Sequence, residues 1–361
     1  MDNLTDLYTD YLLSSFGRAT ATGLSSLLDG SVSHDTVTRH LSREVDPGKE
    51  LWLAVKPLIR EHGRDDACLI VDDTIVEKPR SQSSALNCWH FDHAQGRSVK
   101  GMGILNLLYH SQWEGGQLRV PLSYALVEKP IWYSELATGK ERRKAAKTKN
   151  EQLQEMFLRA LANMVAFRYL LGDSWFCCNS TMRLVHDRGK LFVFELKSNR
   201  LACRGDTARD AGQWTGIEQL GFTGVTPEKV YLKGLDIQVL VVRQVFTNKD
   251  GSTGVRHLVT NDLSLDGAQI AALYQKRWSV EEYHKGIKQN TSVGKSPAST
   301  ATTQSNHVLH SVLAYVKLER IQLSTKTNHF ALKAKIYLAA LKAAYQELGR
   351  IQGIPIKYCY A

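Results

Sequence analysis

The segment YQKRWSVEEYHKGIK, from Tyr274 to Lys288, carries side chains that could handle phosphate and metal together. Four polar residues lie three, four and seven positions apart: Tyr274, Arg277, Glu281 and Lys288. On one continuous helix they would project within roughly 60° of one another. The opposite side would be an apolar stripe formed by Leu273, Val280, Tyr283 and Ile287. We therefore expect a carboxylate between two cations and a phenol on an exposed face, although an ordinary amphipathic helix gives the same pattern.

The spacing also carries a family resemblance. Glu282 would project about 100° away from Glu281, so helical geometry favours Glu281 as the working acid. Tyr-x2-Arg-x3-Glu-x6-Lys resembles the signature of DDE transposases of the insertion-sequence-four group, which are bacterial cut-and-paste elements. Trp278 and Lys285 also resemble residues of that family, as do Glu282 and His284.

The chain before this segment has the pattern of an α/β domain. Ala67 to Val71 is a continuous apolar run, typical of a central strand that we expect to end at Asp72-Asp73-Thr74. Strands at about 101–111 and 118–127 follow, then a helix and a short strand, 168–172, that ends at Asp173. This order matches the start of a ribonuclease-H-like fold, a mixed sheet flanked by helices.

The resemblance implies a catalytic and metal-binding triad of Asp73, Asp173 and Glu281. Asp73 is preferred over Asp72 because the family motif has aspartate followed by threonine. Taken alone, the Asp72-Asp73 pair is also typical of a turn or helix cap, and Asp173 of the N-cap of a helix through Met182 and Val185.

Clustered carboxylates repel one another and need divalent cations. Oxygen ligands and a phosphate substrate favour Mg²⁺, which Mn²⁺ can replace. Two ions per active site, about 3.5–4 Å apart, would support phosphodiester hydrolysis. In the family, the released 3′-hydroxyl then attacks target DNA.

Residues 1–62 are predicted to be helical and to resemble a helix-turn-helix reader of DNA. Ser33 is the expected N-cap of a helix that presents polar residues on its exposed faces: Asp35, Thr36, Arg39, His40 and Arg43. Arg39 and Arg43 are the candidate DNA contacts. An ordinary three-helix bundle has the same outline.

The remaining chain completes a four-part organisation. We expect the catalytic domain at 63–195 and 262–325, a β-rich insertion at 196–261, and a C-terminal helical segment at 326–361. The family's insertion helps to grip the transposon end, and Trp214 within it would stack on a base or fill a core. The last helices would pack on the catalytic domain or join two subunits.

Further DNA contacts follow from the resemblance. Tyr274, Arg277 and Lys288 would hold phosphates, and Trp278 would aid displacement of a base or simply be packed. A basic cluster would track the DNA backbone or form a solvated face: Arg142, Arg143, Lys144, Lys147 and Lys149. His90, Asp92 and His93 would need a further ligand to hold zinc, and no CxxC or HExxH supplies one.

Composition agrees with a polyanionic partner. The 361 residues include 46 basic and 36 acidic ones, a net charge of +10. We expect double-stranded DNA as partner, both terminal inverted repeats and target, and a homodimer on paired ends. Without a secretory segment or an apolar run of about 18 residues, the expected place is the prokaryotic cytoplasm, at the nucleoid and not in a membrane. Two other classes stay open: a catalytically retired, DNA-binding transposase, and a ribonuclease-H-like nuclease without strand transfer.

Overall fold

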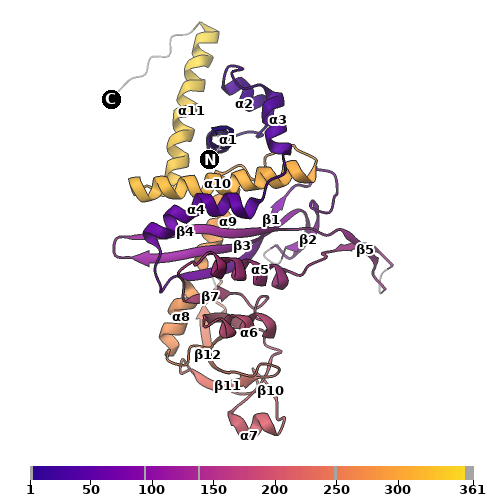
Figure 1. Ribbon diagram of the computed structural model, residues 1–361, viewed down its shortest axis with the longest axis vertical. Helices are drawn as coiled ribbons and strands as arrows, with labels where there is room; N and C mark the ends of the chain where they lie inside the picture. Colours follow the sequence, from indigo (N-terminus) through magenta and orange to yellow (C-terminus); the bar gives the residue numbers. More distant parts are fainter. Residues whose placement is uncertain (1–2, 93–94, 137–138, 248–249, 354–361) are drawn as a thin grey trace. The chain divides into compact units, whose positions relative to one another are not determined.

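The computed structural model describes residues 3–92, 95–136, 139–247 and 250–353 (Figure 1). The chain forms two compact units. Met1–Ala54 and Lys285–Ala361 form the first, which we call the helical unit. Val55–His284 form the second, the sheet unit. In the described part of the chain, no helix is both long enough and apolar enough to cross a membrane.

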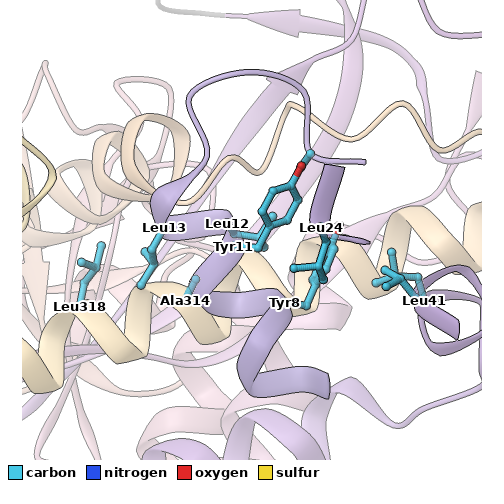
Figure 2. Packing of buried hydrophobic residues seen from close by; sticks show 10 residues of the cluster. Tyr8, Tyr11, Leu12, Leu13, Leu24, Leu41, Ala314 and Leu318 are labelled. Carbon is cyan, nitrogen blue, oxygen red and sulfur yellow. The ribbon is translucent and has the colours of Figure 1, made fainter. Parts of the chain in front are cut away.

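The helical unit is built around one long helix, α10 (Ala301–Thr325). The other helices of this unit are α1 (Asn3–Ser14), α2 (Ala21–Leu27), α3 (His34–Ser42), the first half of α4 (Pro47–His62), the end of α9 (Trp278–Asn290) and α11 (His329–Gln352). Figure 2 shows Tyr8, Leu12 and Leu24 packed with Ala314 and Leu318 of α10. The N-terminal helices therefore share a hydrophobic core with a helix near the other end of the chain.

Polar contacts fix the same helices. The Tyr8 hydroxyl is 3.0 Å from His307 Nδ1, and the Asn306 amide donates to the Leu41 and Arg43 carbonyl oxygens at 2.8 and 2.7 Å. Ser33 is the N-cap of α3, as predicted, because its hydroxyl accepts from the Thr36 N–H at 3.2 Å.

The expected exposure of His40 is wrong. His40 is 7% exposed, and its Nε2 lies 3.1 Å from His310 Nε2 of α10. The reason is helical period: His40 follows Val37 by three positions and precedes Leu41, so it belongs to the stripe that faces α10. Arg39 is exposed, whereas Arg43 is half-buried and its guanidinium donates to Thr5 Oγ1 at 3.4 Å.

The sheet unit contains an 11-stranded mixed sheet. Its strand order is β10-β9-β11-β12-β13-β8-β7-β1-β3-β2, and β4 also pairs with β3. The strands are β1 (Cys68–Glu77), β2 (Cys88–Asp92), β3 (Arg97–Trp113), β4 (Gly116–Val127), β7 (Tyr169–Gly172), β8 (Leu191–Leu196), β9 (Leu201–Cys203), β10 (Thr215–Gly216), β11 (Glu228–Leu232), β12 (Gln238–Thr247) and β13 (Thr253–Thr260). A separate hairpin joins β5 (Ile131–Ser134) to β6 (Glu141–Lys144).

Only the central strands of the described sheet run parallel. β7 is parallel to both β1 and β8, and the other recorded pairings are antiparallel. The helices of this unit are α5 (Lys149–Ala162), α6 (Asn179–Asp187), α7 (Gly205–Asp210), α8 (Gly267–Gln275) and the start of α9. This mixed α/β architecture with N-terminal helices is consistent with a ribonuclease-H-like DDE domain.

Two local predictions are corrected. β1 does not end at Asp72-Asp73-Thr74 but continues to Glu77, since the β-branched residues Thr74, Ile75 and Val76 extend its pairing with β3. The single helix expected over 274–288 is also wrong. α8 ends at Gln275 and α9 begins at Trp278, with Arg277 in the turn between them.

Candidate active site

The two central parallel strands bring two aspartates together. Ile70 of β1 is in register with Leu171 of β7, so Asp72 and Asp173, each two residues further on, come to neighbouring positions. Gly172 allows β7 to fit here, because a Cβ on it would lie 2.8 Å from Val71 Cγ1 and 3.0 Å from Phe194 Cε1. Asp173 is not the N-cap of α6, which is Cys178; its Oδ1 instead accepts from the Trp175 N–H at 2.9 Å.

Asp72 faces the side of the sheet that α9 covers. Its partner on β3 is Asn106, and paired residues of antiparallel strands point to the same face. The Asn106 amide nitrogen lies 3.1 Å from His284 Nε2, and the Tyr283 hydroxyl donates to Asn106 Oδ1 at 3.3 Å. Asp72 therefore lies under the helix that carries Glu281.

Asp73 faces the other side, because successive strand residues alternate. Its Oδ2 accepts from the Lys149 ammonium at 2.7 Å, and Lys149 is the first residue of α5. The Thr148 N-cap fixes the start of that helix through a capping box with Glu151. A well-defined helix end thus holds a cation against Asp73.

Arg277 links the acids on the α9 side. Its guanidinium lies 2.7 Å from Glu281 Oε1 and 3.5 Å from Asp72 Oδ2. The position of Arg277 depends on the break between α8 and α9, where the N–H groups of residues 276, 277, 279 and 280 bond to carbonyls three residues back. One guanidinium therefore connects β1 with α9.

The same break takes Tyr274 out of the expected polar face. Tyr274 is 2% exposed and its hydroxyl donates to Glu195 Oε2 of β8 at 3.0 Å. The expectation of a phenol exposed beside Glu281 is wrong, because the tight turn changes the helical phase between Tyr274 and Glu281. Val280, Tyr283 and Ile287 are buried as predicted.

Burial disfavours the charged forms of two of these acids, Asp72 and Asp173. Burial raises the pKa of the Asp72 carboxyl to about 7, and the neighbouring Asp173 carboxylate adds to the rise while Arg277 opposes it. Burial also raises the pKa of Asp173, against a lowering by the Trp175 N–H and by Arg277. Added positive charge would be favourable here.

A cavity of about 910 Å³ opens beside Asp73. Six of its lining residues are basic: Lys129, Lys147, Lys149, Lys197, Arg200 and Lys233. Trp175 also lines it, with the Lys197 and Lys149 ammonium groups 5.0 and 5.6 Å from its ring centroid. The chemistry of this wall suits a polyanion with phosphate groups.

The carboxylate oxygens of this site suit a divalent cation, although the carboxylates are paired with lysine and arginine side chains. Carboxylate oxygens are the ligands that Mg²⁺ and Mn²⁺ prefer. Among the described residues, no three His, Cys, Asp or Glu side chains are arranged as a ready metal site. An ion bound to Asp73 would compete with Lys149, and an ion bound to Glu281 would compete with Arg277.

The other predicted contacts have surroundings of their own. Trp278 is 60% exposed and lines a second cavity, of about 630 Å³, with Arg119 and Arg256. Glu282 is paired with Arg119, so it points away from Glu281 as expected. Lys285 and Lys288 are exposed and lie in the part of α9 that belongs to the helical unit, where the Lys285 ammonium is 4.9 Å from the Phe330 ring centroid.

The His-Asp-His segment is only partly described. His90 is buried and its Nε2 lies 3.5 Å from Cys88 Sγ. Burial, followed by the charges of Lys129 and Lys149, lowers the pKa of His90 to about 4. His93 lies outside the described residues.

Sequence reasoning missed Asp72 and Lys149 as members of the site. The family motif favours Asp73 over Asp72, and the run before them is apolar at every position, so strand alternation does not distinguish the two acids. Lys149 stood at the end of the predicted basic cluster, and only its position as first residue of α5 brings it to Asp73.

Acids from two adjacent strands and a later helix, one of them beside a basic cavity, are typical of proteins of the DDE type, in which carboxylates serve phosphodiester cleavage. Comparison of the sequence agrees: a DDE superfamily endonuclease model matches residues 2–218, and a transposase DDE domain model matches residues 137–317. The chain therefore belongs to the DDE endonuclease superfamily and has a transposase DDE domain. No curated protein matches it. Members of this family generally use divalent metal ions, and transposases bind DNA.

Proposed function

We propose that this protein is a cut-and-paste transposase of the insertion-sequence-four group, with Tyr274, Arg277, Glu281 and Lys288 as its signature. It binds the terminal inverted repeats of an insertion element, cuts the DNA and joins the 3′-hydroxyl ends to target DNA. The observation that carries the proposal is the meeting of β1, β7 and α9, where Arg277 lies between Asp72 and Glu281 and Asp73 faces the basic cavity.

In this proposal Asp173 and Glu281 are catalytic acids and, with one acid of β1, would hold two Mg²⁺ or Mn²⁺ ions. The family motif makes Asp73 that acid, whereas Asp72 is the one on the side of the sheet that Glu281 faces. Bound by these acids, such ions would supply activation of the attacking oxygen and stabilisation of the leaving one. The protein's own part is to position the DNA: the lysines of the cavity wall bind the phosphates near Asp73. Lys149, beside Asp73, and Arg277, beside Glu281, would bind the phosphate groups around the scissile bond if bound ions replaced their contacts with the acids.

Other parts of the chain take supporting roles. Residues 1–62 contact the DNA end through Arg39 and Arg43, and Trp278, Lys285 and Lys288 support the bound strand. Tyr274 is buried and bonded to Glu195, so it would act only by positioning Arg277. The catalytic domain comprises 63–195 and 262–325, with 196–261 as its insertion and 326–361 as a helical segment. Two copies act together on paired ends at the bacterial nucleoid.

Cleavage of linear DNA that carries the element's own ends tests the function. Wild type with Mg²⁺ should release the ends and form joined products. Glu281→Gln should bind the ends without cutting them. Glu282→Gln is the matched control, since Glu282 is the next residue and is paired with Arg119; it should cut as wild type does.

The outcomes separate the alternatives. Cutting without joined products would favour a ribonuclease-H-like nuclease. Binding without cutting by the wild type would favour a catalytically retired, DNA-binding protein. Equal cutting by the wild type and Glu281→Gln would mean that Glu281 is not a catalytic acid.

A further inference from the structure

A further cavity, which we call the aromatic cavity, adjoins the cavity beside Asp73. Its volume is about 840 Å³, and it shares His90, Phe91 and Lys129 with the first. β2 contributes one wall and the β5–β6 hairpin another. Both cavities lie within the sheet unit, and their shared lining makes them neighbours.

Exposed aromatic rings line the aromatic cavity. Trp89 and Phe91 alternate with the buried Cys88 and His90 along β2, and are 62% and 54% exposed. Trp132 of the hairpin is 57% exposed. Large exposed aromatic side chains gathered around one cavity are unusual unless they meet a partner.

Arginine and lysine side chains lie over or beside the rings of the hairpin. In the hairpin Trp132 is paired with Arg143, and the guanidinium carbon lies 4.2 Å from the Trp132 ring centroid. Tyr133 is paired with Arg142, and the Lys144 ammonium is 5.8 Å from the Tyr133 ring centroid. Two acids stand among them: Glu135, paired with Arg142 at 2.9 Å, and Glu141, in the cavity wall. The balance is still basic.

Lys129 fixes the junction between the two cavities. Its ammonium donates to the Trp89 carbonyl oxygen at 2.8 Å, and its N–H donates to the Ala85 carbonyl oxygen at 2.8 Å. β2 is thereby tied to the chain that follows β4. The aromatic wall is held in place at the point where it meets the basic wall beside Asp73.

We propose that the cavity formed by β2 and the β5–β6 hairpin binds the unpaired bases of a DNA single strand that leaves the cavity beside Asp73. Trp132, Trp89 and Phe91 stack on the bases, and Lys129 and Arg143 contact the backbone phosphates. Rings bind any base through its π-face, whereas paired bases within a duplex keep theirs covered. The ligand is therefore a single strand and not a duplex. This inference rests on the proposed function only in taking DNA as the substrate.

The test compares single-stranded and double-stranded DNA on the full-length protein. The probes are a fluorescent oligothymidylate of about 16 nucleotides and a duplex of the same length, at one salt concentration. Trp132→Ala should bind the single strand about 5- to 100-fold more weakly and the duplex nearly as tightly as wild type. Trp132→Tyr, which keeps a stacking ring, should restore most of the binding. Leu136→Ala, an exposed change in the same hairpin, should alter neither.

A stacking-specific signal supports the same comparison. A single strand that carries 2-aminopurine should lose fluorescence on binding the wild type and Trp132→Tyr, and lose much less with Trp132→Ala. Unchanged binding of the single strand by Trp132→Ala would overturn the inference. So would an equal loss for single strand and duplex, because the hairpin would then contact duplex phosphates.

The experiments distinguish failure of the single-strand site from failure of the proposed function. A wild type that binds the single strand through Trp132 but cuts no DNA end would keep this site and refute the transposase. A wild type that cuts and joins ends, while Trp132→Ala binds the single strand normally, would refute this site alone.

Discussion

Asp72 and Asp73 are consecutive residues of β1 whose carboxylates contact cations on opposite faces of the sheet. Asp72 Oδ2 lies 3.5 Å from Arg277 Nη1, and Asp73 Oδ2 lies 2.7 Å from Lys149 Nζ. A strand turns successive side chains to alternate faces, so the two acids have different neighbours despite their adjacency. Substitution of Asp72 and substitution of Asp73 should therefore have different effects on DNA cleavage.

The first prediction concerns these two acids. Asp73→Asn should slow cleavage of DNA ends by more than about a hundredfold, because it removes a proposed metal ligand that faces the basic cavity. Asp72→Asn should slow it by less than about tenfold, because the amide resembles the neutral acid that burial favours at this position. Cleavage rates in Mg²⁺ measure both, with binding of the ends as the control for folding. A larger loss in Asp72→Asn would make Asp72 the ligand on β1.

The second prediction concerns the lysine that holds Asp73. Lys149→Ala should bind Mn²⁺ about fivefold more tightly without DNA, because the ion would no longer displace an ammonium from a partly buried pair. Calorimetric titration gives the dissociation constant. Lys147→Ala is the matched control, since Lys147 pairs with Glu155 in an exposed contact and should leave Mn²⁺ binding unchanged. Weaker binding in Lys149→Ala would show that the lysine supports the metal site and does not compete with it.

The strands that build the site could be predicted from the sequence, because local patterns determine them. The apolar run before Asp72 and the turn residues between 111 and 118 predict the strands that form β1, β3 and β4. The short strand predicted before Asp173 is β7. The C-terminal helices were predicted from apolar spacing in the same way. These features depend on neighbours along the chain.

What could not be predicted depends on residues far apart in the sequence. His40 is buried because α10 lies against it, some 270 positions later in the chain. Arg277 stands in a tight turn where helical spacing suggested an unbroken helix, and it reaches Asp72 from 205 positions away. Lys149 meets Asp73 only because a capping box starts α5 at that point. The helical signature therefore predicts Glu281 as a candidate acid but does not predict its environment.

The third prediction concerns acid stability. Burial, and then the charges of Lys276 and Arg119, lowers the pKa of His110 from 6.5 to about 4. The unfolded chain binds this proton below pH 6.5 and the folded chain does not, so stability is lost as pH falls from about 6.5 to about 4. For this one group the loss is about 3 kcal/mol at most. His110→Gln cannot take up the proton and should lose less stability over this range.

Urea unfolding at pH 7 and pH 4.5 measures the difference. The pKa of Asp72 is raised, so its contribution to stability changes with pH in the sense opposite to that of His110. That contribution is the same in the wild type and in His110→Gln, and it cancels when the two proteins are compared. Equal losses in the wild type and His110→Gln would show that His110 accepts its proton in the folded state.

The last prediction concerns the core that the N-terminal helices share with α10. Leu12 of α1 is fully buried in the cluster of Figure 2, so Leu12→Ala leaves a cavity and should lower the free energy of unfolding by about 2–5 kcal/mol. Leu27→Ala is the matched control: Leu27 is 60% exposed at the end of α2, and its loss should cost less than about 0.5 kcal/mol. Urea unfolding measures both. If Leu12→Ala is no more costly than Leu27→Ala, contacts other than this cluster hold α1 to α10, with the Tyr8–His307 and Asn306 hydrogen bonds as the next ones to remove.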